Sequence, residues 1–199
     1  GVFFFLMIRR PTGSTLFPYT TLFRSRIGGN CLANQRYPQH AGDCLRHVRC
    51  PMSDRPPVSS DDLRGAAALC AGSVLRIDPA LWEKQAYGLE WTRSRTVSHI
   101  GDALAFYSRS LASRNQENPG VRGLVLREGS IEASASQIES GAEVLVRVSD
   151  GTPQGVRAFS PTGSPDAEGF LAMACVEILV HGYDAVAGTE ADFDPEDGF

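Results

Sequence analysis

Two histidines and one glutamate have the residue types and the spacing to hold a metal ion. Glu177 and His181 stand four residues apart in the apolar stretch 175–185. On a helix, residues four apart project from the same face, one above the other. His99, far upstream, offers a second imidazole if the fold brings it alongside. Two imidazoles and one carboxylate would leave coordination positions open, as in catalytic metal sites.

Simpler interpretations of the same residues stay open. An isolated histidine on a helix is more often a core or surface residue than a ligand, and a Glu–His pair at this spacing is often only a helical side-chain contact. Asp102 and Asp184 each follow one of the histidines by three residues and could orient its imidazole, but they could equally face solvent or cap a helix. The nearby aromatic residues are expected in the core or at the rim of a pocket: Trp82, Trp91, Phe106 and Tyr107.

Four stretches with apolar residues at helical spacing are expected to position these side chains. The first begins at Ser59 or Ser60, where a hydroxyl followed by two acids suits a helix start, and it ends at Ile77 before Asp78-Pro79. The others are expected at about 92–113, 130–149 and 166–187. A loop at 152–165, with three prolines and two glycines, precedes the last helix and is expected to be functional.

The four helices predict an all-α fold, a four-helix bundle with a long loop before its last helix. One face of the last helix carries ionisable groups among apolar ones: Phe170, Ala174, Glu177, His181 and Asp184. Ionisable groups on an inward face need partners, and a metal ion would be one. Strand-type alternation is absent, although 123–126 could form a short extended piece.

The first quarter of the chain has a different character. Residues 15–25 (TLFPYTTLFRS) resemble the conceptual translation of a sequencing adapter, and 3–10 (FFFLMIRR) commonly accompanies it. Residues 1–51 hold seven arginines and one acid, a net charge of +6, whereas 52–199 hold twelve basic and twenty-two acidic residues, a net of −10. We expect 1–51 to be an artefactual leader, disordered or non-native, and Met52 to be the genuine start of a single domain over 52–199.

A zinc site is the alternative for part of this leader. His40, Cys44, His47 and Cys50 are separated by three, two and two residues, a spacing that a small zinc site could use. The neighbouring adapter sequence and the lack of an apolar pattern favour unselected translation instead.

Composition places the remaining domain in a reducing compartment. Cys70 and Cys175 lie among apolar residues and are expected to be buried free thiols in the cytoplasm. Lys84 is the single lysine beside eighteen arginines, which indicates a GC-rich genome. We expect no membrane segment, because no apolar run is long enough, and the acidic balance argues against a nucleic-acid partner.

Short motifs around the candidate ligands resemble one known family. Trp91-Thr92 and 96–102 (TVSHIGD) resemble a segment of the DinB-like, mycothiol-dependent maleylpyruvate isomerase group. Residues 169–173 (GFLAM) and 177–184 (EILVHGYD) resemble the C-terminal signature of that group. The order and separation of the motifs extend the resemblance over about 61–195.

The resemblance implies a DinB-like up-down-down-up bundle whose metal ligands are His99, Glu177 and His181. It implies a divalent ion, with zinc expected first, and mycothiol or a related low-molecular-weight thiol as co-substrate. The thiolate would attack a small electrophilic substrate, and the protein would be an isomerase or an S-transferase. Because two histidines and one glutamate also suit nickel, iron and manganese, the residues leave the native metal open.

Two alternatives to an enzyme remain. The bundle could bind metal without catalysis, as a regulatory module, or the chain could be an inactive fragment. The second follows from residues 194–199 (DPEDGF), which carry no clear end signal, whereas members of the resembled group continue into further structure. We therefore expect the domain to be truncated at its C-terminus.

Overall fold

A computed structural model describes residues 56–118, 129–191 and 193–195. The leader, its cysteine–histidine pattern and residues 123–126 lie outside this part of the chain. The described residues form four α-helices and a short 3₁₀ helix: α2 (Ser60–Val74), η2 (Pro79–Leu81), α3 (Arg93–Ser113), α4 (Ile131–Asp150) and α5 (Ala167–Val186). In these residues β-structure is limited to two isolated bridges. The predicted all-α class is confirmed.

Each long helix begins at a side chain that caps it. Ser59 caps α2 and forms a capping box with Asp62, while Thr92, Ser130 and Asp166 cap α3, α4 and α5. In every case a side-chain oxygen accepts a hydrogen bond from a backbone N–H of the first turn, which has no partner within the helix. The local sequence therefore fixes where these helices start, within one residue of the prediction.

The end of the first helix was predicted too late. Helix α2 ends at Val74 rather than at Ile77, because the next residues continue as a tighter turn. The backbone N–H groups of Arg76 and Ile77 donate to carbonyls three residues back instead of four. Ile77 still packs in the core with 2% of its surface exposed.

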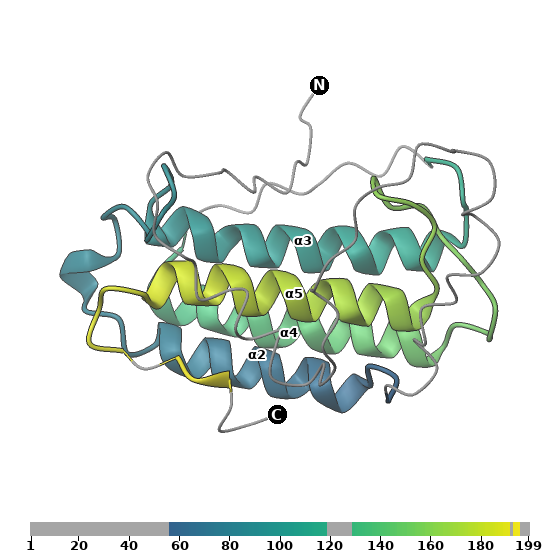
Figure 1. Cartoon of the computed structure of the whole chain (residues 1–199), viewed down its shortest axis with the longest axis horizontal. Coiled ribbons are helices and arrows are strands. Elements are labelled where there is room, and N and C mark those ends of the chain that lie inside the picture. Colours follow the sequence, from purple (N-terminus) through teal and green to yellow (C-terminus); the bar gives the residue numbers. More distant parts are fainter. Residues whose placement is uncertain (1–55, 119–128, 192, 196–199) are drawn as a thin grey trace, which may run out of the picture. The chain divides into compact units, whose positions relative to one another are not determined.

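The helices run in the up-down-down-up order, so that α3 and α4 point the same way (Figure 1). Helices α2 and α3 each pack against both α4 and α5. The Ser60 hydroxyl at the start of α2 donates to Asp150 at the end of α4, so these two helices are antiparallel. The backbone N–H of Val58 donates to Glu168, so α2 and α5 start at the same end. The start of α3 lies beside the end of α5, so these two are antiparallel as well.

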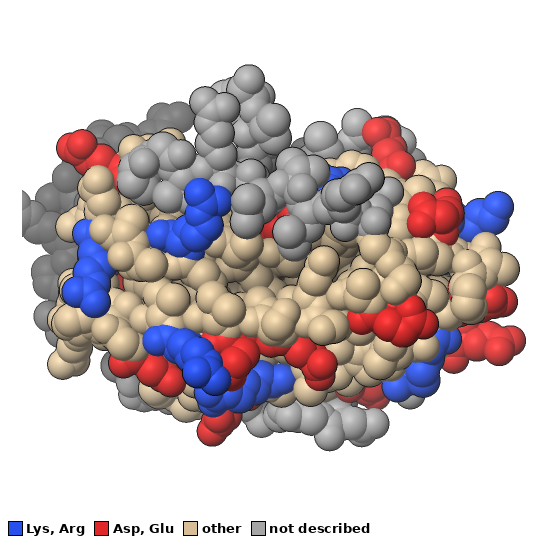
Figure 2. All heavy atoms as spheres, turned by 180° about the vertical axis from the view of Figure 1, so that it is seen from behind, with Lys and Arg blue, Asp and Glu red and all other residues tan. Residues whose placement is uncertain are grey.

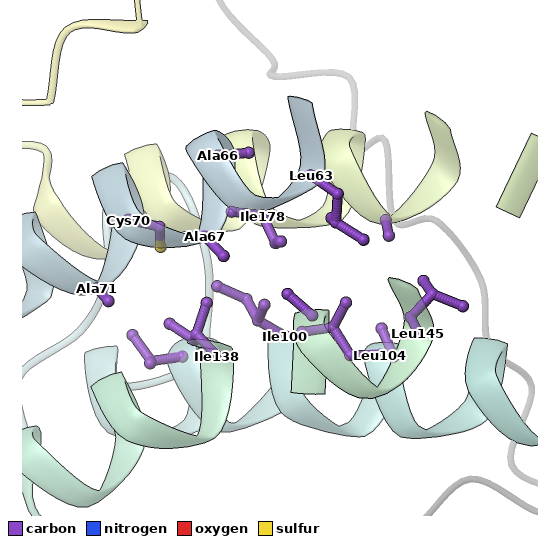
Figure 3. Close-up of a cluster of buried hydrophobic side chains, with 14 of the residues drawn as sticks. Leu63, Ala66, Ala67, Cys70, Ala71, Ile100, Leu104, Ile138, Leu145 and Ile178 are labelled. Atoms are coloured by element: carbon purple, nitrogen blue, oxygen red, sulfur yellow. The ribbon is translucent and has the colours of Figure 1, made fainter. Parts of the chain in front are cut away.

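All four helices contribute to one apolar core (Figure 3). Leu63 of α2, Ile100 of α3, Ile138 of α4 and Ile178 of α5 are each fully buried. Burying one such side chain stabilises the fold by roughly 1.5–3 kcal/mol. Outside the core, acidic and basic side chains lie side by side on the face seen from behind, rather than as a patch of one sign (Figure 2).

Helix α5 corrects the expectation that no apolar run is long enough for a membrane. By length and composition, this one helix of the described residues could cross a bilayer. A core helix of a bundle meets the same criterion, and Phe170, Ala174 and Ile178 of α5 are fully buried in the protein core. The two cysteines are free, as expected, but only Cys70 is buried, whereas Cys175 is half-buried.

The two long connections described lie at opposite ends of the bundle (Figure 1). The 152–165 loop is tied to the end of α3 by a hydrogen bond from the Phe159 N–H to the Asn115 carbonyl. The connection between α2 and α3 is tied to the end of α5 by a hydrogen bond from the Tyr87 N–H to the Asp184 carbonyl. Only the second connection lies at the end where His99 and His181 meet, so the 152–165 loop is not the one beside the candidate ligands.

Candidate metal centre

The three candidate ligands converge between α3 and α5. His99 projects from the second turn of α3, and Glu177 and His181 project from the second half of α5. The Glu177 Oε2 atom lies 3.8 Å from His99 Nε2 and 3.4 Å from His181 Nε2. All three ligand atoms lie within 4.8 Å of one another. Because α3 and α5 run antiparallel, a residue early in one and residues late in the other reach the same level of the bundle.

These separations fit a divalent ion. Ligand atoms about 2.0–2.2 Å from a tetrahedral zinc ion lie roughly 3.3–3.6 Å apart. The two distances to Glu177 are already within a few tenths of an ångström of that range. The three side chains are only 11–19% exposed, so they are largely shielded from water. Metal binding by these residues stays a prediction that the geometry supports.

The two imidazoles have opposite pKa shifts. Burial, His181 and Arg95 lower the pKa of His99 to about 4, although Glu177 opposes the shift. Burial also disfavours a charged His181, but the carboxylates of Asp184 and Glu177 outweigh it and raise the pKa of His181 to about 9. Burial raises the pKa of Glu177, but His181, Tyr107 and His99 together bring it below its usual value. The metal-free cluster therefore holds one proton at neutral pH, on His181.

The carboxylate of Asp184 lies beside the imidazole of His181 and could orient it. Its Oδ2 atom lies 3.4 Å from His181 Nδ1, within ion-pair distance. Among the described residues, Nδ1 nevertheless has no hydrogen-bond partner. A metal-bound histidine usually turns its other nitrogen toward a carboxylate or carbonyl, and Asp184 is placed for that role.

Asp102 has a different neighbour. Its side chain is 2% exposed, and its Oδ2 atom lies 3.6 Å from Arg95, two turns earlier on α3. The structure thus shows a buried carboxylate in an ion pair with Arg95. The predicted orienting role of Asp102 toward His99 stays a prediction.

Tyr107 is the site residue that sequence reasoning missed. It was expected to be a core or rim aromatic, and with 7% exposure it is a core residue. Its hydroxyl, however, donates a 2.9 Å hydrogen bond to Glu177 Oε1. The sequence places Tyr107 eight residues after His99, on the same helical face, where a hydroxyl in the core requires a partner, but it does not indicate which partner.

The other predicted aromatics divide between the core and the rim. Trp82 and Phe106 are buried, and the Trp82 indole donates to the Gly129 carbonyl. Trp91 is 38% exposed, and its ring centre lies 5.2 Å from that of His99. The Arg95 guanidinium lies 5.5 Å from the Trp91 ring centre. Trp91 and Arg95 therefore form one rim of the candidate site.

Comparison with known proteins gives a structural likeness. No family model matches the chain, and no curated protein matches its sequence. A solved structure, the crystal structure of the mycothiol-dependent maleylpyruvate isomerase, is similar with a TM-score of 0.52. The fold is DinB-like. The match covers 68% of this chain at 15% identity, and at this level of identity the likeness shows the fold alone.

The chain spans 62% of the length of that solved structure. The remaining part of the isomerase has no counterpart in the match, so the activity and substrate of that enzyme do not transfer with the fold. The family membership that the short motifs indicate stays a prediction.

Proposed function

We propose that this protein is a metal-dependent enzyme that uses a low-molecular-weight thiol to isomerise or S-conjugate a small electrophilic substrate. The observation that carries the proposal is the convergence of His99, Glu177 and His181 from two distant segments, with their ligand atoms within 4.8 Å. The similar structure, that of a mycothiol-dependent maleylpyruvate isomerase, supports mycothiol or a related thiol as the co-substrate. We expect the enzyme to be cytoplasmic, where such a thiol is kept reduced.

The residues of the chain fit this chemistry. A bound divalent ion, with zinc expected first, would supply a thiolate at neutral pH, because coordination removes the thiol proton. His99 is uncharged at neutral pH and offers its Nε2 lone pair, while Glu177 supplies the single negative charge facing both imidazoles. His181 must release its proton to bind the ion, so Asp184 would then accept a hydrogen bond from Nδ1.

The reaction class follows from thiolate chemistry. A thiolate that adds to an activated double bond turns it into a single bond, about which the substrate rotates, and elimination returns the thiol. A thiolate that displaces a leaving group gives a thioether product instead. Neither Cys70 nor Cys175 competes for this role, since burial raises the pKa of the Cys70 thiol to about 12 and that of the Cys175 thiol to about 11.

The test compares Glu177→Gln with Glu139→Gln, which removes a carboxylate from α4. Each protein is loaded with zinc, dialysed and measured for bound metal. Each is then incubated with mycothiol and either maleylpyruvate or 1-chloro-2,4-dinitrobenzene. We expect about one zinc per chain in the wild type and in Glu139→Gln, and at least tenfold weaker binding in Glu177→Gln, because the site loses its charged ligand. Isomerisation or thiol consumption should follow metal content.

The outcomes separate the rival functions. Equal zinc content in all three proteins would reject the metal centre. Zinc binding without thiol-dependent turnover of either probe would instead favour a non-catalytic metal-binding module or an inactive fragment.

A further inference from the structure

Two helical faces meet at the candidate metal centre, and Tyr107 joins them. His99, Ala103 and Tyr107 are spaced by four along α3, so they share one face. Phe170 and Glu177 are seven residues apart on α5, two turns along a single face. Tyr107 contacts both of these α5 residues, one through its ring and the other through its hydroxyl.

The ring of Tyr107 is held in place by its neighbours. Its centre lies 6.0 Å from that of Phe170 at an interplanar angle of 61°, and 5.9 Å from that of Phe106 at 66°. Edge-to-face pairs of this kind are favourable beyond their buried area. Phe170 is fully buried, so the Tyr107 ring has little room to turn. The position of its hydroxyl is therefore set by core packing rather than by the metal centre itself.

The two carboxylate oxygens of Glu177 have different neighbours. Oε1 accepts the 2.9 Å hydrogen bond from Tyr107, while Oε2 is the atom that lies near both imidazole nitrogens. A carboxylate whose first oxygen is held in this way offers its second oxygen alone to an ion.

We propose that Tyr107 is a positioning residue that makes Glu177 a one-oxygen metal ligand. The inference rests on the metal centre of the proposed function and deepens it. One-oxygen binding leaves coordination positions open for a thiol and a substrate, whereas a carboxylate bound through both oxygens would occupy one of them. Tyr107 acts through Glu177 and touches neither substrate nor thiol.

A merely structural role for Tyr107 makes a different prediction. In that case the hydroxyl only satisfies a buried carboxylate, whose burial without a partner is costly. Loss of the hydroxyl would then lower the unfolding midpoint of the metal-free protein, but would leave zinc affinity and coordination geometry unchanged. Metal affinity and a coordination spectrum therefore separate the two roles.

The test uses Tyr107→Phe, with Tyr87→Phe as the matched control. Tyr87 is 54% exposed, and its ring contacts Tyr183 rather than any of the three candidate ligands. In the full chain, zinc dissociation constants are measured by chelator competition, and Co²⁺ is substituted to record its visible absorption. We expect Tyr107→Phe to bind zinc about 10–100-fold more weakly, as partners of metal ligands typically do, and Tyr87→Phe to match the wild type. The Co²⁺ bands of Tyr107→Phe should weaken, because a two-oxygen Glu177 raises the coordination number.

The possible outcomes test the role of Tyr107 and the proposed function separately. Unchanged zinc affinity and an unchanged Co²⁺ spectrum in Tyr107→Phe would overturn the inference and leave the proposed function standing. Weaker zinc binding together with no thiol-dependent turnover by the wild type would support the inference while the proposed function fails. A wild type that binds no zinc overturns both. If Tyr107→Phe does not fold, Phe170→Leu keeps the hydroxyl but loosens the ring, and zinc affinity equal to that of the wild type would then overturn the inference.

Discussion

The two histidines of the candidate metal centre show how position, rather than residue type, decides charge. His99 is half-buried and lies near His181 and Arg95, so its protonated form is disfavoured. His181 is also half-buried, but it lies between the carboxylates of Glu177 and Asp184, which favour its protonated form. The single proton of the metal-free cluster lies among the same atoms that would coordinate an ion. We expect zinc binding to displace this proton.

The free energy of unfolding of the metal-free protein should therefore depend on pH in two opposite ways. The pKa of His181 rises from 6.5 to about 9 on folding, so its contribution is fully present below pH 6.5 and is lost as the pH rises through 9. The pKa of His99 falls to about 4, so its contribution is present above pH 6.5 and is lost as the pH falls toward 4. These two groups together favour maximum stability near pH 6.5.

Urea unfolding in the presence of a chelator, at pH 6.5 and pH 9, measures the contribution of His181 to the free energy of unfolding. Between these two pH values, we expect the free energy of unfolding of the wild type to fall by up to about 3 kcal/mol more than that of His181→Gln. His99→Gln should show the same decrease in the free energy of unfolding at alkaline pH as the wild type. At acid pH its free energy of unfolding should decrease less than that of the wild type. An alkaline loss of the same size in His181→Gln and the wild type would show that the proton lies elsewhere.

At this scale the sequence predicted the ligand geometry in part. The four-residue spacing of Glu177 and His181 required only a helix to bring them to one face. The approach of His99 required two helices to pack in register, and the short motifs, not the spacing, indicated it. Tyr107 was missed because a tyrosine in an apolar stripe has the same pattern whether its hydroxyl reaches a ligand or not.

At the scale of elements, helices α2 and α5 approach each other closely beside the candidate centre. Gly182 of α5 follows His181 directly, and a Cβ atom there would lie 2.8 Å from the Cys70 sulfur of α2 and 3.0 Å from the Phe193 ring. Cys70 is fully buried, so it cannot move aside without disturbing the core. A glycine at this position lets α5 approach α2 and fixes the depth at which His181 lies.

We predict that Gly182→Ala destabilises the protein by about 1–3 kcal/mol relative to Gly72→Ala, measured by urea unfolding. Gly72 is the matched control, because it is also helical but a Cβ atom there meets nothing nearer than 4.0 Å. Both substitutions gain the same helix propensity, so their difference isolates overpacking. Equal free energies of unfolding would mean that α2 and α5 can separate without cost.

Helix starts were predictable, and helix ends less so. Ser59, Thr92, Ser130 and Asp166 each act through hydrogen bonds to their own first turn, which needs no tertiary information. The end of α2 depends instead on three residues that tighten into a turn while Ile77 remains in the core. The spacing of apolar residues continues through that turn, so the periodicity alone placed the end three residues too late.

At the scale of the whole molecule, the up-down-down-up order decides which loop lies beside the candidate metal centre. The 152–165 loop was expected to be functional because of its length, yet it is hydrogen-bonded to the end of α3, whereas His99 lies near the start of that helix. The α2–α3 connection lies at the ligand end and carries Trp91 beside His99. Loop length is a property of the sequence, but the end of the bundle at which a loop lies follows only from the direction of every helix before it.

The last prediction concerns which part of the chain carries the bundle. Each described core residue lies between 58 and 193, as do the three candidate ligands and all four helix caps. A chain that begins at Met52 should therefore keep the far-UV helical signal per molecule, an unfolding midpoint within about 2 °C of the full chain, and the same zinc stoichiometry.

A chain that begins at Ser60 is the matched control for this deletion. It lacks the Ser59 cap of α2 and the hydrogen bond from Val58 to Glu168, so it should be less stable by about 1 kcal/mol or more. Differential scanning calorimetry of the three chains measures both effects. If the Met52 chain melts as low as the Ser60 chain, residues 1–51 stabilise the bundle and are more than an artefactual leader. If the Met52 chain matches the full chain and the Ser60 chain melts lower, the stabilising contacts begin at the cap of α2.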